Sequence, residues 1–105
     1  MLAKIHKCAR RYRLLYSSHA RQEMELEEPG RIKQDEVFEA LIHGRIIEDY
    51  PEDKPYHGCV IFGKTSEDRP LHIVCAYAEE DDAVIVLTAC EADAGQLDGC
   101  ERKLK

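Results

Sequence analysis

The sequence lacks the long apolar segments and cofactor motifs that identify many protein classes. It has no run of about 18 apolar residues, so we expect no transmembrane helix. The first 11 residues do not follow the basic-then-apolar order of a secretory signal, and we therefore expect a cytoplasmic protein. Neither a phosphate-cradling glycine loop nor a dinucleotide fingerprint occurs, which disfavours nucleotide-dependent enzymes and predicts no cofactor. A length of 105 residues predicts one domain, residues 1–105.

The sequence also lacks CxxC pairs, although it contains five cysteines. In a cytosolic protein this odd number predicts free thiols, and Cys59 and Cys75 lie in apolar runs that favour burial. His57 and His72 stand near these cysteines and raise the question of zinc. Both cysteines fall inside expected strands, however, and His72 and Cys75 should point to opposite faces of the sheet. We therefore expect no metal site.

Acidic residues are absent from the first 22 positions, whereas the rest of the chain contains all 21 of them. The net charge of the whole chain is −6, which by itself argues against nucleic-acid binding. The uneven distribution instead predicts a basic contact surface on an acidic body. The basic residues of this first segment are Lys4, Lys7, Arg10, Arg11, Arg13 and Arg21.

Helical patterns occupy the first part of the chain. Residues 2–12 place apolar side chains on one arc and cations on the opposite arc, which predicts an amphipathic helix. A short extended piece, residues 14–17, follows. Ser18 is the expected N-cap of a second helix over residues 19–28. A third helix begins near Asp35 and ends at His43, before Gly44.

After Gly44 the hydrophobic pattern changes to that of strands. The linkers between the last three apolar runs are short and polar, which predicts an antiparallel meander. We therefore predict an α+β fold, with N-terminal helices packed on one face of a small, mostly antiparallel four-stranded sheet. The domain would comprise a basic helix (1–13), a core (14–92) and a tail (93–105). The expected strands are residues 45–49, 59–63, 71–77 and 84–89.

Two histidines are candidates for chemistry. His19 stands at the start of the second helix, where the helix dipole favours its neutral form, and Arg21 follows closely. The imidazole could act as a general base while the arginine holds a phosphate, or His19 could simply fix the entry of the helix. Alternation puts His72 and Val74 on one face of their strand. His72 is available to a ligand if that face is open to solvent, and is a core residue if it faces the helices.

Several short motifs resemble one bacterial family. They are Tyr16-Ser17-Ser18-His19-Ala20, the helix end His43-Gly44, the strand 70–74 and the strand end 86–89. In order and spacing they resemble the domain of unknown function 4258 family over roughly residues 13–92. The tail departs from the family, which tends to have aromatics and a proline after the strand end at residues 88–89.

Many members of that family look like the toxin of a toxin–antitoxin pair. The resemblance therefore implies a fold similar to RelE/ParE-type toxins and an antitoxin protein as partner. Such toxins often cleave RNA without a metal. Their basic residues and a histidine or tyrosine help a ribose 2′-hydroxyl attack its own phosphate.

Two classes of function remain open. The first is a toxin-like, metal-independent ribonuclease or ribosome-directed protein, with His19, Arg21 and His72 as catalytic residues. This hypothesis requires the basic helix and the turn at residues 17–21 to share one exposed side of the sheet. The expected phosphate-binding residues are Lys4, Lys7, Arg10, Arg11, Arg13, Lys64 and Arg69.

The second class is a non-catalytic interaction module. Its basic helix would bind an acidic partner, such as an antitoxin or a second copy of the chain. The same cations could also form an ordinary solvated surface. The apolar face of this helix is too small to anchor the chain on a membrane, so we expect no membrane partner.

Overall fold

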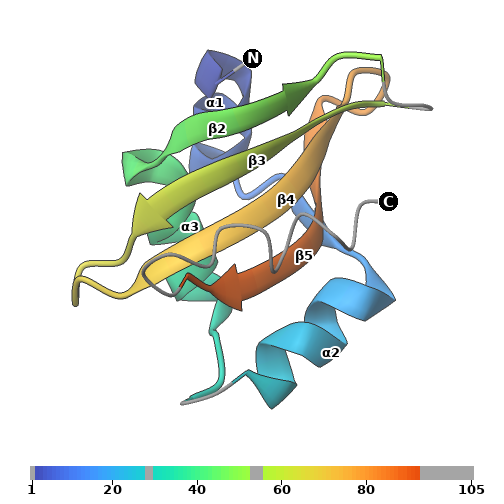
Figure 1. Ribbon diagram of the computed structural model, residues 1–105. Coiled ribbons are helices and arrows are strands. Elements are labelled where there is room, and N and C mark those ends of the chain that lie inside the picture. Colours follow the sequence, from blue (N-terminus) through green and yellow to red (C-terminus); the bar gives the residue numbers. More distant parts are fainter. Residues whose placement is uncertain (1, 28–29, 53–55, 93–105) are drawn as a thin grey trace.

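The computed structural model describes residues 2–27, 30–52 and 56–92, which form three helices and one five-stranded sheet (Figure 1). The α+β class is confirmed. The expected tail, residues 93–105, lies outside the described residues, in which no helix is long and apolar enough to cross a membrane. The elements are α1 (Leu2–Arg10), β1 (Leu14–Tyr16), α2 (Ser18–Leu26), α3 (Gln34–His43), β2 (Arg45–Tyr50), β3 (His57–Lys64), β4 (Pro70–Ala78) and β5 (Ala83–Glu91).

The sheet has the strand order β1-β5-β4-β3-β2. Strands β2 to β5 form the expected antiparallel meander. The expectation of four strands is wrong, because β1 pairs in parallel with β5, with Leu14 opposite Val84 and Tyr16 opposite Val86. A three-residue strand is too short to show a periodic pattern, and its partner is distant in the sequence.

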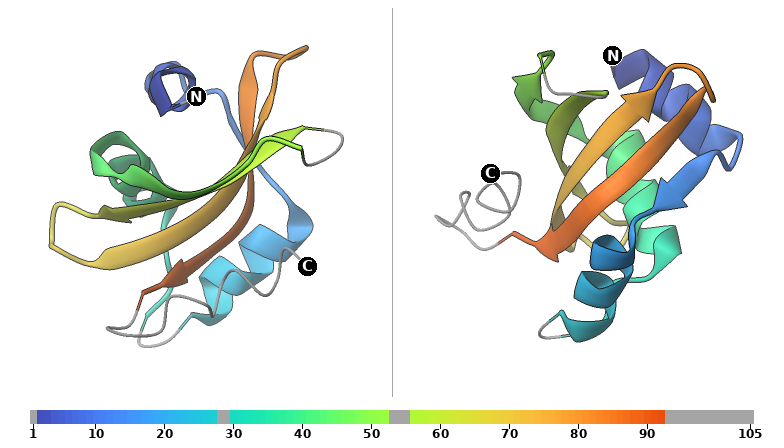
Figure 2. Two further views of the ribbon diagram at one scale, coloured as in Figure 1. Left: turned by 45° about the horizontal axis from the view of Figure 1, so that its top comes forward. Right: turned by 90° about the vertical axis from the view of Figure 1, so that its right-hand side faces the viewer.

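Helices α1 and α3 cover one face of the sheet (Figure 2, left). Their apolar sides, with Ile5 and Leu41 fully buried, pack against Ile61 and Ile73 of the central strands. Helix α2 runs beside the second half of β5 instead. Its start is held by a hydrogen bond from the Ser17 amide to the carbonyl of residue 86 (3.0 Å), and its end by one from the amide of residue 91 to Glu27 (2.6 Å).

The expected alternation along β4 is confirmed. Ile73 and Cys75 belong to the core beneath the helices, whereas Val74 packs with Val60 on the opposite face. His72 is two residues from Val74 and shares its face, since successive side chains of a strand alternate. His72 therefore points away from α1 and α3.

The boundaries of α2 and α3 follow from local hydrogen bonds. The N-cap of α2 is Ser17 rather than the expected Ser18, because the Ser17 hydroxyl accepts a hydrogen bond from the Ala20 amide (3.0 Å). At the start of α3, the Lys33 amide donates to a Glu36 carboxylate oxygen (2.9 Å). This carboxylate satisfies one of the amides that a helix start leaves free.

Candidate functional site

Basic residues of α1 and of the segment that follows it lie beside the end of β4 and the acidic turn between β4 and β5. The Arg13 guanidinium donates hydrogen bonds of 2.9 and 2.8 Å to the carbonyl oxygens of residues 82 and 81, and the Lys4 ammonium lies 5.3 Å from the centre of the Tyr77 ring. A hydrogen bond from the Tyr77 hydroxyl (2.7 Å), helped by the charges of Lys7 and Arg13, holds the pKa of Asp82 below its usual value. Of the five expected phosphate-binding cations in residues 4–13, Lys4, Lys7 and Arg13 thus already interact with β4 or with the turn that follows it.

The basic helix α1 precedes β1, whereas His19 follows it at the start of α2. Helix α1 contacts the start of β5, where the Cys8 thiol lies 3.4 Å from the carbonyl of residue 82. Helix α2 runs along the end of β5, and the two helices lie at opposite ends of β1 (Figure 2, right). Arg10 and Arg11 are exposed at the C-terminal end of α1.

His19 and Arg21 point away from each other on α2. Residues two apart on a helix differ by about 200° in direction. The His19 side chain is 56% exposed and lies 3.7 Å from a Glu23 carboxylate oxygen one turn later. Arg21 lies on another side of the helix, beside the segment that leads into α3. The structure therefore does not place the His19 imidazole and the Arg21 guanidinium where both could act on one phosphate.

His72 occupies neither of its two expected environments. It faces away from α1 and α3, yet it is only 1% exposed. Its ring packs edge-on against Phe62, with ring centres 5.6 Å apart, and its Nε2 has no hydrogen-bond partner among the described residues. Burial lowers the pKa of His72, although the charge of Glu48 opposes the shift. The structure does not bring His72 together with His19 and Arg21.

The lowered pKa of His72 predicts a pH-dependent stability. An unfolded chain takes up this proton near pH 6.5, whereas the folded protein resists protonation until a lower pH. The contribution of His72 to the free energy of unfolding is therefore complete above about pH 6.5 and is lost as the pH falls toward the folded-state pKa. The slope is at most about 1.4 kcal/mol per pH unit, the limit for one proton.

Urea unfolding of the wild type and of His72→Leu, measured from pH 7.5 to 5, isolates the contribution of His72 to the free energy of unfolding. The contributions of the other histidines are the same in both proteins and cancel in the difference. We expect the wild type to lose more stability than the variant over this range. An equal loss in both proteins would show that the buried imidazole does not resist protonation.

Arg69 joins three parts of the chain and is not a free phosphate ligand. Its guanidinium donates to Glu91 (2.6 Å), to Glu36 (3.1 Å) and to the carbonyl of Gly30. The side chain is 17% exposed. Burial alone would lower the pKa of Arg69, but the hydrogen bonds to Glu91 and Glu36 raise it. Lys64, the other candidate of this loop, is exposed and lies 3.6 Å from an Asp68 carboxylate oxygen.

The four candidate zinc donors do not converge. Cys59 and Cys75 lie opposite each other beneath the helices, with their sulfur atoms 3.8 Å apart, whereas His72 is on the other face. The expectation of free thiols is only partly confirmed. Cys8, Cys59 and Cys75 are free, but Cys90 is disulfide-bonded.

Arg21 instead belongs to a cluster of cations that sequence analysis missed. Together with Arg31 and Lys33 it lines a hollow of about 260 Å³ between α2 and the segment before α3. We call this the cationic hollow. The segment folds back along α2 because the Ile32 amide donates to the Met24 carbonyl (2.8 Å) and the Ile32 side chain is buried. Its two neighbours, Arg31 and Lys33, are therefore left exposed.

The chemistry of the cationic hollow suits an anion. Three cations and only one carboxylate, that of Glu25, line it. Among the residues that the structure describes, none of the three cations forms an ion pair. Gln34, the first residue of α3, also lines it, so the positive end of the helix dipole lies close by. Guanidinium groups bind phosphate through paired hydrogen bonds. The sequence signal was the alternation of charged and apolar residues at positions 31–33, directly before a helix start.

Comparison with known proteins gives one match. A family model described as "Domain of unknown function (DUF4258)" matches residues 16–91, which is most of the chain. No curated protein and no solved structure matches the chain. The matched region begins at the end of β1 and includes α2, α3 and the whole meander. It therefore contains the cationic hollow and leaves out α1.

Proposed function

Because the chain belongs to the domain of unknown function 4258 family, we propose that it is a toxin-like component of a bacterial toxin–antitoxin pair that acts by binding RNA. Phosphates of the RNA occupy the cationic hollow. The observation that carries the proposal is the convergence of Arg21, Arg31 and Lys33 around one open depression. The toxin-like role comes from what resemblance to the family implies.

Charge and position support RNA as the ligand. The chain has a net charge of −6, so nonspecific attraction to RNA is weak and binding must come from a local concentration of cations. Arg13 donates to the turn between β4 and β5 and Lys4 lies over the Tyr77 ring, whereas Arg21, Arg31 and Lys33 form no ion pair with another described residue. The cationic hollow lies within the part of the chain that the family model matches, as expected for a property of the family.

Binding has more geometric support than cleavage. His19 lies on another side of α2 from Arg21, and His72 is buried on the face of the sheet opposite α3. General acid–base catalysis needs both groups within hydrogen-bond reach of one reacting phosphate. We therefore expect His19→Ala to leave RNA affinity unchanged within about twofold, because a neutral exposed side chain adds little to phosphate binding.

Reversing one charge in the cationic hollow tests the proposal. We expect Arg21→Glu to weaken binding of a fluorescent single-stranded RNA by at least about tenfold at low salt, because one contact is lost and a repulsion is added. Induced expression of this variant should no longer arrest growth. Fluorescence anisotropy measures the affinity.

Arg45→Glu is the matched control. Arg45 is an exposed arginine at the start of β2, on the far edge of the sheet, and it lies over the Phe62 ring (5.8 Å). Both variants change the net charge equally. If Arg45→Glu weakens binding as much as Arg21→Glu, the attraction is general and the cationic hollow is not the RNA site.

A further inference from the structure

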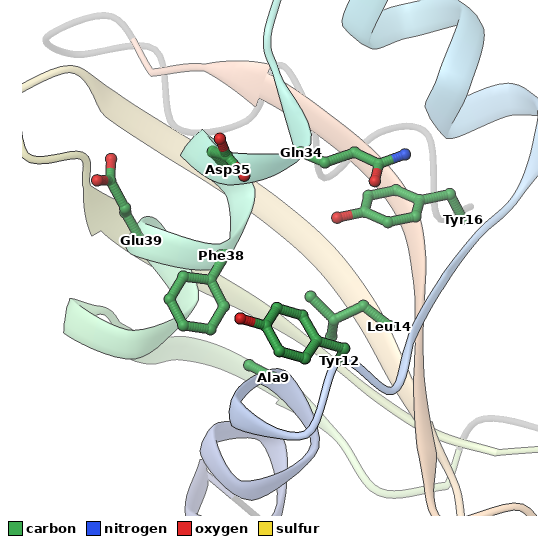
Figure 3. A pocket seen from close by; sticks show the side chains of 8 residues that line it. All are labelled: Ala9, Tyr12, Leu14, Tyr16, Gln34, Asp35, Phe38 and Glu39. Carbon is green, nitrogen blue, oxygen red and sulfur yellow. The ribbon is translucent and has the colours of Figure 1, made fainter.

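A second depression lies on the other side of Gln34 and has the opposite charge. It occupies about 400 Å³ between the end of α1, β1 and the first turns of α3 (Figure 3). Tyr12 and Tyr16 enter it from one side, and α3 contributes Phe38 from the other. We call it the acidic aromatic groove, since two carboxylates of α3 complete its wall.

The carboxylates of this groove are those of Asp35 and Glu39, and no lysine or arginine lines it among the described residues. The Ser66 amide donates to Glu39 (3.1 Å), and this hydrogen bond lowers the pKa of Glu39, which keeps it ionised. Burial, together with the negative charge of Asp35, raises the pKa of Tyr16 to about 12. The Tyr16 hydroxyl therefore stays neutral, and the groove carries two negative charges beside three aromatic rings.

The exposed Tyr12 has an unfavourable backbone conformation. Helix α1 ends with hydrogen bonds from the Tyr12 amide to the carbonyl of Ala9 (3.1 Å) and from the Arg13 amide to that of Cys8 (2.9 Å). A helix that ends with this pair of hydrogen bonds usually has glycine at the place that Tyr12 occupies, because the residue there must adopt a positive φ. Tyr12 has a φ of +58° and is 89% exposed. Stability alone would favour glycine here, and the strained tyrosine therefore points to a function for its ring.

We propose that the acidic aromatic groove binds an arginine side chain from a segment of a protein partner. The planar guanidinium stacks on aromatic faces and forms paired hydrogen bonds with carboxylates, so it uses both features of the groove. A nucleic-acid backbone would be repelled by Asp35 and Glu39. The proposal does not depend on RNA binding by the cationic hollow.

A pair of peptides tests the proposal on the full-length chain. The probe is acetyl-Gly-Gly-Arg-Gly-Gly-amide, and the control replaces arginine by citrulline, which has nearly the same shape but no charge. NMR spectra of the labelled protein report binding through resonances of Tyr12, Tyr16 and Phe38. We expect saturable shifts with the arginine peptide and at least about fivefold weaker binding of the citrulline peptide.

Variants of the groove separate charge from ring contact. Asp35→Asn removes one charge at an exposed position, and Tyr12→Gly removes the ring while suiting the positive φ. Each should weaken binding of the arginine peptide at least about threefold with the spectrum otherwise preserved. Arg45→Ala, far from the groove, should not.

Three results would overturn the proposal. They are equal binding of the two peptides, arginine binding that survives Asp35→Asn combined with Glu39→Gln, and tighter binding of guanosine or cytidine than of the arginine peptide. The last result would identify the groove as a site for a nucleobase. RNA binding that Arg21→Glu leaves unchanged would contradict the proposed function but would not alter the peptide result, so the two proposals fail separately.

Discussion

Replacing Gly63 by alanine is expected to lower the free energy of unfolding by at least about 3 kcal/mol, or to prevent folding. A Cβ atom at position 63 would lie 2.0 Å from the carbonyl oxygen of Ala40 and 2.7 Å from its carbonyl carbon. These are backbone atoms of α3, which cannot rotate away as a side chain would. The substitution forces α3 away from β3, and with it the buried Leu41.

Gly30 provides the matched control, because a Cβ atom there would meet nothing within 4 Å. We expect Gly30→Ala to unfold within about 0.5 kcal/mol of the wild type in urea, followed by circular dichroism. Equal unfolding midpoints for Gly63→Ala and Gly30→Ala would contradict the close packing of α3 on β3.

The second large effect is expected for Arg69→Ala, with a loss of about 2–4 kcal/mol. Arg69 is the cation between Glu36 of α3 and Glu91 of β5. Both carboxylates are less than a quarter exposed, so removing the guanidinium leaves two negative charges close together without compensation. The carbonyl of Gly30 also loses its donor, which loosens the segment that places Arg31.

Two further variants distinguish this network from a general charge effect. Lys64→Ala removes an exposed cation near the same loop and should cost less than about 0.5 kcal/mol, as is usual for a surface ion pair. Arg69→Lys keeps the charge but cannot reach both carboxylates and the carbonyl, so it should recover only part of the loss. A stability of Arg69→Ala equal to that of Lys64→Ala in urea unfolding would show that the network contributes little.

Local patterns predicted most of the fold. Gly44 and the acidic residues Asp35 and Glu36 gave the extent of α3 to within one residue. The strands of the meander were predicted in the correct order and are up to two residues longer at each end. The extended piece at residues 14–17 was predicted and forms β1, but its place in the sheet was missed, because it pairs with β5 through residues 70 positions apart.

The functional surface was harder to predict, because it depends on how segments pack. Basic residues are easily counted in the sequence, but their value for binding depends on what faces them. Lys4 lies over the Tyr77 ring of β4, Arg13 donates to the turn between β4 and β5, and Arg69 is held by two carboxylates. Arg31 and Lys33 were not predicted as binding residues. They lie beside α2 because of a backbone hydrogen bond from the Ile32 amide, which the sequence does not reveal.

The salt dependence of RNA binding tests the cationic hollow most directly. Each phosphate contact with single-stranded RNA adds about 0.7 to the slope of log affinity against log salt concentration. A variant with Arg21→Gln, Arg31→Gln and Lys33→Gln should therefore have a slope about 2 units smaller than the wild type, with weaker binding at low salt. Equal slopes for the two proteins would mean that these three cations do not contact phosphate, and would contradict the proposed function.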